Sequence, residues 1–112
     1  MIDSYTFGRI VVNGKTYTND VIVYPQFVDG RWWRKEGHRL CIDDIRSIVD
    51  RRPEVLVIGT GHSGLMKVLP ETKEYVESKG IELVAQKTTE ACDTYNRLLK
   101  SKRVVAALHL TC

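Results

Sequence analysis

A nearly unbroken apolar run at residues 54–58 constrains the fold more than any other part of the chain. The run reads Glu54-Val55-Leu56-Val57-Ile58, and glycines follow it directly. Successive side chains of a strand point to opposite faces of its sheet, so a strand that is apolar throughout has to be covered on both sides. The run therefore predicts a central strand with a layer of structure on each face.

Helix patterns flank this strand and recur after it. Asp43 or Asp44 can cap a helix in which Ile45, Ile48 and Val49 share one face, and Pro53 ends it. Pro70 favours the start of a second helix, which Gly80 ends. The remaining elements are a strand at 81–85, a helix from Thr88 or Thr89 to residue 99, and a strand at 104–110. A strand–helix–strand–helix–strand order predicts parallel strands joined by right-handed crossovers.

The first forty residues have a different pattern, which is typical of antiparallel strands. Asn13-Gly14 separates two short β-prone runs at 9–12 and 15–17, and this dipeptide favours a tight hairpin turn. A short strand at 20–24 ends at Pro25, and residues 29–41 suit another hairpin or an extended excursion. We therefore predict one α/β domain over residues 1–112, with a mixed sheet, N-terminal antiparallel hairpins and a C-terminal βαβαβ half.

Length and cysteine usage limit the function classes. A chain of 112 residues forms one ordinary domain and needs neither a metal nor a disulfide to fold. Its cysteines, Cys41, Cys92 and Cys112, lack CxxC spacing, and Cys92 suits a small core position. No signal peptide or membrane-spanning run is recognisable in the sequence. We expect a cytoplasmic protein with reduced thiols, no metal, no cofactor and no membrane association.

The sharpest local motif is the glycine loop, Gly59-Thr60-Gly61-His62-Ser63-Gly64, which follows the apolar strand. Such glycines can let backbone N–H groups converge on an anion, and Thr88 and Asn96 could complete that site. A dinucleotide site fits poorly, because Pro70 delays the next helix and Gln86-Lys87 stands where an acidic ribose ligand is expected. The open alternatives are a small-anion site and a structural turn; His62 and Ser63 are the only candidates for hydrolytic chemistry.

Basic residues gather in one segment that also holds both tryptophans. Residues 31–39 carry four positive charges and one negative charge, which accounts for the whole formal net charge of +3. Arg31, Trp32, Trp33 and Arg34 are candidates for binding a protein partner, although one inward and one outward tryptophan in an ordinary strand would explain the pattern too. No motif of a nucleic-acid-binding fold accompanies them, so we do not expect nucleic acid as a partner.

Two further basic clusters have a simpler explanation. Arg51-Arg52 falls at the end of the first predicted helix, and Arg97, Lys100, Lys102 and Arg103 fall at the end of the third. Cations at these positions complement the negative end of the helix dipole. Neither cluster by itself therefore predicts a binding site.

The motifs in their order along the chain also resemble a known family. They are Phe7-Gly8, Asp20-Val21-Ile22-Val23 with Pro25, Trp32-Trp33, the 53–61 segment, Ala91 with Thr94-Tyr95-Asn96-Arg97-Leu98-Leu99, and residues 103–108. The chain resembles a small family of α/β domains that includes archaeal and bacterial hypothetical proteins, the human adipogenesis-associated domain protein and a mitochondrial assembly factor for respiratory complex I. The resemblance implies a compact sheet with helices on its faces, and it supplies no catalytic residues.

Two functions follow as expectations. The first is a cytoplasmic binding or assembly-type domain without cofactor chemistry, in which the segment around Trp33 contacts a protein partner. The alternative is a protein or small enzyme that binds a small anion or a nucleotide-related ligand at Gly59–Gly64, at the carboxyl ends of the strands. The features favour a binding domain over an enzyme. A homodimer through an open sheet edge is possible with either function.

Overall fold

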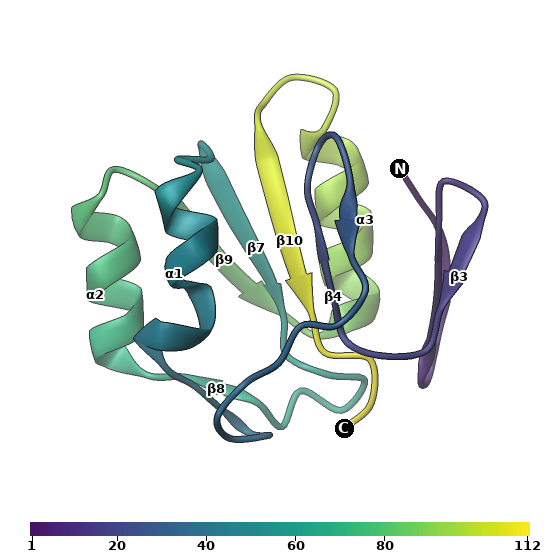
Figure 1. Cartoon of the computed structure of the whole chain (residues 1–112), viewed down its shortest axis with the longest axis horizontal. Coiled ribbons are helices and arrows are strands. Elements are labelled where there is room, and N and C mark those ends of the chain that lie inside the picture. The colour runs from purple at the N-terminus through teal and green to yellow at the C-terminus, as the bar shows by residue number, and fades with distance from the viewer.

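The computed structural model describes residues 1–112 and places the apolar run inside a five-stranded sheet (Figure 1). The sheet has the order β5-β4-β10-β7-β9. Parallel pairing joins β7 to β10 and to β9, whereas β4 runs antiparallel to β10 and to β5. The predicted mixed sheet is therefore confirmed. Its strands are β4 (Val21–Val23), β5 (Val28–Asp29), β7 (Val55–Gly59), β9 (Glu82–Gln86) and β10 (Val104–Leu108).

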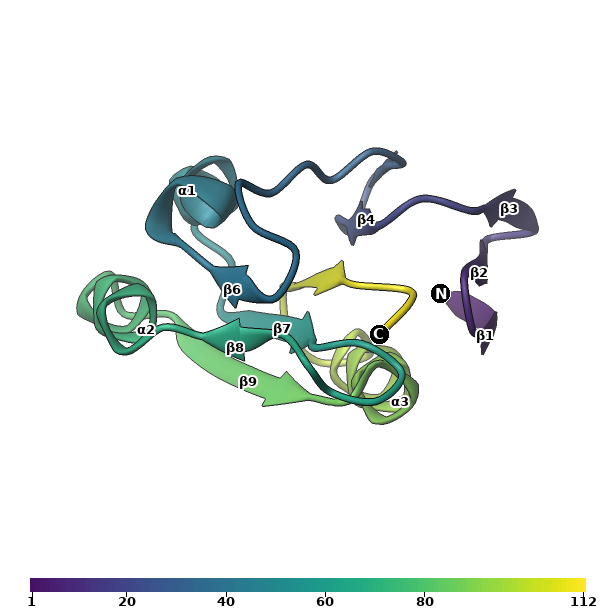
Figure 2. The same cartoon turned by 90° about the horizontal axis from the view of Figure 1, so that it is seen from below.

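Three helices cover the two faces of the sheet. The helices α1 (Ile42–Asp50) and α2 (Pro70–Ser78) lie on one face, and α3 (Thr88–Leu98) lies on the other (Figures 1 and 2). Alternate residues of β7 feed two separate cores, because Val55 and Val57 pack on the α3 side whereas Leu56 and Ile58 pack on the α1 side. The apolar run is thus buried on both faces, as its composition predicted.

The ends of the helices agree with the local sequence signals. Pro70 is the first residue of α2, and Gly80 follows its end with φ +77°. The first helix begins one residue before Asp43, and Asp44 in its first turn accepts a hydrogen bond from the N–H of Cys41 at 2.8 Å. Asp44 therefore stabilises the helix start from inside the first turn, where acidic side chains complement the dipole.

The N-terminal residues form a three-stranded antiparallel meander of their own. Its strands are β1 (Ile2–Thr6), β2 (Arg9–Val12) and β3 (Lys15–Tyr17). The predicted turn is confirmed, because Asn13 and Gly14 both have positive φ, 49° and 80°. The meander packs beside α3, where Ile2, Ile10 and Val12 enter the same core as Val55 and Val57.

Between β5 and α1 the chain makes an extended excursion, one of the two predicted alternatives. The short strand β6 (Arg39–Leu40) pairs in parallel with β8 (Lys67–Val68). Trp32 anchors the excursion to α1, since its side chain is buried and its indole N–H donates to the carbonyl of Asp44 at 3.0 Å.

The last four residues leave the sheet earlier than predicted. Strand β10 ends at Leu108, and residues 109–112 turn from its end toward the start of α3, on the side away from β9 (Figures 1 and 2). The N–H of Leu110 donates to Asp20 at 2.8 Å, and the carbonyl of Leu110 accepts hydrogen bonds from Gly8 and from the Tyr5 hydroxyl. Bonds to the meander and to Asp20 replace a continued strand ladder and join the meander to the main sheet. None of the helices combines the length and the hydrophobicity that crossing a bilayer requires.

Candidate functional site

Most backbone N–H donors of the glycine loop are engaged within the protein. The N–H of Gly61 donates to the Thr88 hydroxyl at 2.9 Å. The N–H groups of His62 and Leu65 donate to the carbonyls of Thr111 and Cys112, at 2.6 and 3.1 Å. Carbonyl oxygens of the 109–112 segment thus accept the hydrogen bonds that a bound anion would otherwise accept. This arrangement favours the structural-turn interpretation of the motif.

At two positions of the loop, neighbouring atoms leave no room for a side chain, so only glycine fits. Gly61 has φ +110°, and a Cβ on it would overlap the carbonyl carbon of Cys112. A Cβ on Gly59 would lie 2.8 Å from Leu108 Cδ2 and 2.9 Å from Thr88 Oγ1. The spacing that resembles a phosphate loop is therefore explained by the packing of residues 109–112 and of α3 against β7.

The other residues predicted for an anion site lie elsewhere or have other partners. Thr88 is fully buried, and its hydroxyl donates to the carbonyl of His109 at 2.6 Å. Asn96 faces β1, where its amide donates to the Ile2 carbonyl and accepts from the Ile2 N–H, each at 2.8 Å. Thr88 therefore lies against the glycine loop as expected, but its hydroxyl is engaged by Gly61 and His109, and the Asn96 side chain is engaged by β1.

The remaining loop side chains form no catalytic arrangement. The Thr60 hydroxyl donates to the Gln86 carbonyl at 3.0 Å, and Gly64 is positioned by a bond from its N–H to the Gly61 carbonyl. The His62 ring lies against Phe7, with 5.8 Å between ring centroids, and no hydrogen bond joins His62 to Ser63. A base–nucleophile pair needs such a bond, so the geometry offers none here.

The basic aromatic segment divides into buried and exposed side chains. Trp32 is 6% exposed, whereas Trp33 is 75% exposed. Arg34, predicted as a surface residue, has only 6% of its side chain exposed, and its guanidinium lies 4.7 Å from the Trp32 ring. The Arg34 side chain thus lies mostly inside the fold, where it contacts Trp32 and Asp20. Arg31 remains on the surface, and its guanidinium makes no ion pair or hydrogen bond.

Arg34 belongs to a buried polar cluster that the sequence did not reveal, formed by Asp20, Arg34 and His109. Asp20 Oδ2 lies 2.7 Å from Arg34 Nη1 and 2.8 Å from His109 Nδ1, while its Oδ1 accepts the N–H of Leu110. Burial raises the pKa of Asp20, but the hydrogen bonds from His109, Leu110 and Arg34 outweigh it, so the pKa lies below its ordinary value. Asp20 is therefore ionised at neutral pH and accepts hydrogen bonds from Arg34 and from the N–H of Leu110. His109 Nδ1 lies within hydrogen-bond distance of both Asp20 Oδ2 and Arg34 Nη2, at 2.8 and 3.0 Å.

Incomplete hydrogen bonding marks this cluster as unusual. Arg34 Nε and His109 Nε2 are buried side-chain nitrogens without a hydrogen-bond partner, and no other buried side-chain nitrogen or oxygen lacks one. Buried polar atoms are nearly always paired, because leaving one unpaired costs about 1–3 kcal/mol. Two such atoms in one three-residue cluster single out this part of the molecule.

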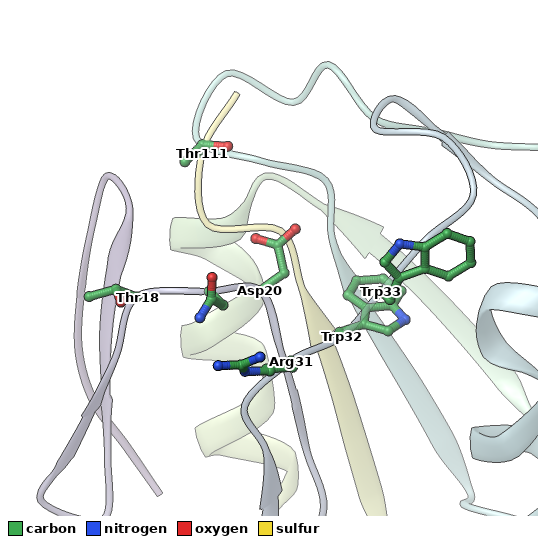
Figure 3. A pocket seen from close by; sticks show the side chains of 7 residues that line it. Thr18, Asp20, Arg31, Trp32, Trp33 and Thr111 are labelled. Atoms are coloured by element: carbon green, nitrogen blue, oxygen red, sulfur yellow. The ribbon is translucent and has the colours of Figure 1, made fainter.

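A cavity of about 520 Å³ opens beside the cluster. We call it the tryptophan pocket, and Figure 3 shows its lining. The Asp20 carboxylate lies in its middle, on the Thr111 side, and Trp33 forms the opposite wall. The pocket combines an aromatic wall, an unpaired cation at Arg31 and a floor fixed by ionic hydrogen bonds. Its lining residues are Thr18, Asn19, Asp20, Arg31, Trp32, Trp33 and Thr111.

Asp20 and His109 were missed as site residues for a simple reason. They are 89 residues apart, and each looks like the polar end of a short apolar strand. Only the antiparallel pairing of β4 with β10 brings the two strand ends together. The one signal in the sequence was that each of these ionisable residues stands directly beside an apolar run, at residues 21–23 and 104–108.

The fold and this site define a single-domain α/β protein with a mixed sheet, an appended meander and an open surface pocket. The chain belongs to the family described as protein of unknown function (DUF498/DUF598), whose model matches residues 2–109. The family resemblance that the motifs indicated is therefore confirmed.

Individual relatives share both sequence and fold. The crystal structure of a conserved hypothetical protein from Pyrococcus horikoshii OT3 is 30% identical, with a TM-score of 0.83 over 100% of this chain and 99% of that one. NADH dehydrogenase [ubiquinone] 1 alpha subcomplex assembly factor 3 of Xenopus tropicalis is 25% identical over 95% of this chain, which spans only 58% of that protein. A 13 kDa major membrane protein of Francisella tularensis is 28% identical, over 93% of this chain and 85% of that protein.

Proposed function

We propose that this chain is a binding domain of the assembly type that contacts a protein partner through the tryptophan pocket. The observation that carries the proposal is the 75% exposure of Trp33 on the wall of a cavity with a fixed floor. The assembly factors among its relatives support an assembly-type role. The proposal includes no cofactor chemistry.

The pocket has the chemistry of an interface centre. Exposed tryptophans contribute a large share of binding energy where they become buried in a complex, and arginines do so where they pair with a partner's carboxylate. Arg31 has its guanidinium free for such a pair. Asp20 is ion-paired with Arg34, so it repels an incoming carboxylate little. The partner we infer is a protein segment with an acidic residue next to an apolar or aromatic one.

The pocket is also pre-organised, which lowers the entropic cost of binding. Trp32 is fixed beneath it by the bond to Asp44, and Asp20 is fixed by three hydrogen bonds. The side chains of Trp33 and Arg31 make no such bonds, so a partner that contacts them would restrict their motion. Anion binding at Gly59–Gly64, the alternative function, has less support, because the loop donates its N–H groups to Thr88, Thr111 and Cys112.

Affinity capture with two pocket variants and one control tests the proposal. Trp33→Ala and Arg31→Ala remove the wall and the free cation, and both residues are exposed, so the fold should survive. Phe27→Ala is the control, because Phe27 is a 44% exposed aromatic residue outside the pocket. We expect the pocket variants to lose partners that the wild-type chain and Phe27→Ala both retain. Unchanged capture by Trp33→Ala, with the fold verified by circular dichroism, would overturn the proposal.

The cytoplasmic location predicted from the sequence belongs to the same proposal. Fractionation of cells that produce the chain at its natural level tests it. Recovery in the cytoplasmic fraction at low and high salt is the expected result, and recovery in a membrane fraction that salt does not release would contradict it. The membrane fraction is included because the Francisella tularensis relative is named a major membrane protein.

A further inference from the structure

Two basic pairs that the sequence separates by fifty residues meet at one end of the sheet. Arg51-Arg52 follows α1, and Lys102-Arg103 precedes β10. The N–H of Glu54 donates to the Arg103 carbonyl at 2.8 Å, and the N–H of Arg103 donates to Glu54 Oε1 at 2.8 Å. These bonds tie the two turns together. In Figure 1 both lie at the top, at the opposite end of β10 from residues 109–112.

A second cavity, of about 330 Å³, opens between these turns and the turn that follows β4. We call it the arginine cavity. Its volume falls in the range of small-ligand sites, and no acidic residue lines it. Both an aromatic and an apolar surface accompany the two cations. The lining residues are Tyr24, Pro25, Gln26, Arg51, Pro53, Arg103 and Val105.

The Arg51 guanidinium is held in place without using its hydrogen-bond donors. Its central carbon lies 4.9 Å from the Tyr24 ring centroid and 4.8 Å from that of Phe27. Those two rings stack on each other, with centroids 4.5 Å apart and planes inclined by 18°. Cation–π contact engages the face of a ring with the positive charge and leaves guanidinium N–H donors free for oxygen acceptors.

The guanidinium N–H donors of Arg103 are also free to bind a ligand. Neither its guanidinium nor that of Arg51 takes part in an ion pair or a side-chain hydrogen bond. The adjacent carboxylate, Glu54, accepts the backbone N–H of Arg103 instead. Two cations therefore line one cavity, and no carboxylate lies within ion-pair distance of either guanidinium.

Helix dipoles explain only part of this arrangement. Arg51 and Arg52 cap the last turn of α1, since their N–H groups donate to Ile48 and Val49, and cations are favoured there. The dipole of α1 does not account for Arg103, which comes from a different turn. It also does not account for a cavity between the two turns. A ligand that pairs with both guanidinium groups accounts for the complete arrangement.

We propose that the arginine cavity binds a small dianion, a phosphate monoester or a dicarboxylate, with Arg51 and Arg103 each donating to its oxygens. Forked N–H donors match the oxygen spacing of both phosphate and carboxylate groups. Tyr24 and Val105 supply the surface for a short carbon skeleton. This site is separate from the tryptophan pocket and does not depend on the proposed protein partner.

Amide chemical shifts measured by NMR test the site in the folded chain. The ¹⁵N-labelled protein is titrated with inorganic phosphate, with succinate and with sodium chloride at matched ionic strength. We expect saturable shifts at the amides of residues 24, 26, 51, 52, 54, 55 and 103–105 with phosphate, with succinate or with both, and none that saturate with chloride. The two dianion arms distinguish a phosphoryl ligand from a dicarboxylate.

Charge-removing variants decide whether the two arginines are responsible. Arg103→Gln should weaken dianion binding by about tenfold, because it removes one forked ionic contact. Arg51→Gln should weaken dianion binding to a similar extent. This variant also loses the contact of Arg51 with the Tyr24 and Phe27 rings, so if it is unstable, Arg103→Gln alone decides the test. Arg9→Gln, in β2, is the matched control and should bind as the wild type does. Equal shifts with chloride, no saturable shift, or undiminished binding by Arg103→Gln would each overturn the proposal.

Discussion

Replacement of Gly61 by alanine is the most direct test of the structural role assigned to the glycine loop. Alanine adds a single methyl group, yet at this position the group would overlap the backbone of Cys112. The residue must also keep φ +110°, which side-chain-bearing residues rarely adopt. The 109–112 segment would have to move away from the loop.

The expected cost follows from the contacts involved. Holding a non-glycine residue at such a φ costs about 1–3 kcal/mol. Displacing residues 109–112 breaks the bonds that His62 and Leu65 donate to Thr111 and Cys112, each worth about 0.5–1.5 kcal/mol. We expect Gly61→Ala to lower the free energy of unfolding by about 4 kcal/mol, a large share of the roughly 5–15 kcal/mol of an ordinary domain.

Gly80→Ala is the matched control for this experiment. Gly80 also has positive φ, +77°, but no atom would lie within 4 Å of an added Cβ. This variant therefore carries the backbone strain alone, about 1–2 kcal/mol. Urea denaturation followed by far-UV circular dichroism measures both. If Gly61→Ala is no less stable than Gly80→Ala, residues 109–112 do not pack against the loop as described, and the loop amides are free for a ligand.

Three further predictions concern the core and the buried cluster. The pKa of Asp20 is lower in the native state than its ordinary 3.8, so ionised Asp20 stabilises the fold fully above pH 3.8 and this contribution is lost as the pH falls below that value. The difference in free energy of unfolding between wild type and Asp20→Asn should therefore narrow between pH 5 and 2 in urea titrations. A difference that stays constant over this range would contradict the lowered pKa. Trp32→Ala should cost about 3–5 kcal/mol in thermal or urea unfolding, whereas Trp33→Phe should change stability by less than about 0.5 kcal/mol. Burial raises the pKa of Cys92 to about 12, so iodoacetamide at pH 8 should alkylate the exposed Cys112 long before Cys92 in a mass-spectrometric time course; equal rates would refute the burial of Cys92.

Secondary structure was predictable where one segment carries its own signal. The Asn13-Gly14 turn, the apolar run of β7 and the Pro70 start of α2 depend on local sterics and periodicity, and the structure confirms all three. The end of β10 was predicted two residues too late. His109 and Leu110 are as compatible with a strand as their neighbours, but their hydrogen bonds join them to partners distant in sequence, among them Gly8, Asp20 and Thr88.

The candidate site was predictable only in part for the same reason. The exposure of one tryptophan and the burial of the other could be anticipated from their adjacency in an extended segment. The burial of Arg34 could not, because it depends on an ion pair with Asp20 and on the Trp32 ring. The glycine motif suggested a site that its contacts do not favour. Its spacing is typical of a phosphate-binding loop, but N–H groups of the loop donate to residues 109–112 instead.

The position of β10 has a consequence for how the chain is synthesised. This strand joins β4 to β7, yet it follows both in sequence, and the contact between Asp20 and His109 spans 89 residues. While the ribosome is still adding residues before 104, the apolar strand β4 has no neighbour on its β10 side. Pairing across such long separations is slow, and an unpaired apolar strand edge invites association with other chains. The nascent chain is therefore at its most aggregation-prone just before β10 emerges, and that interval is when a chaperone would benefit it most.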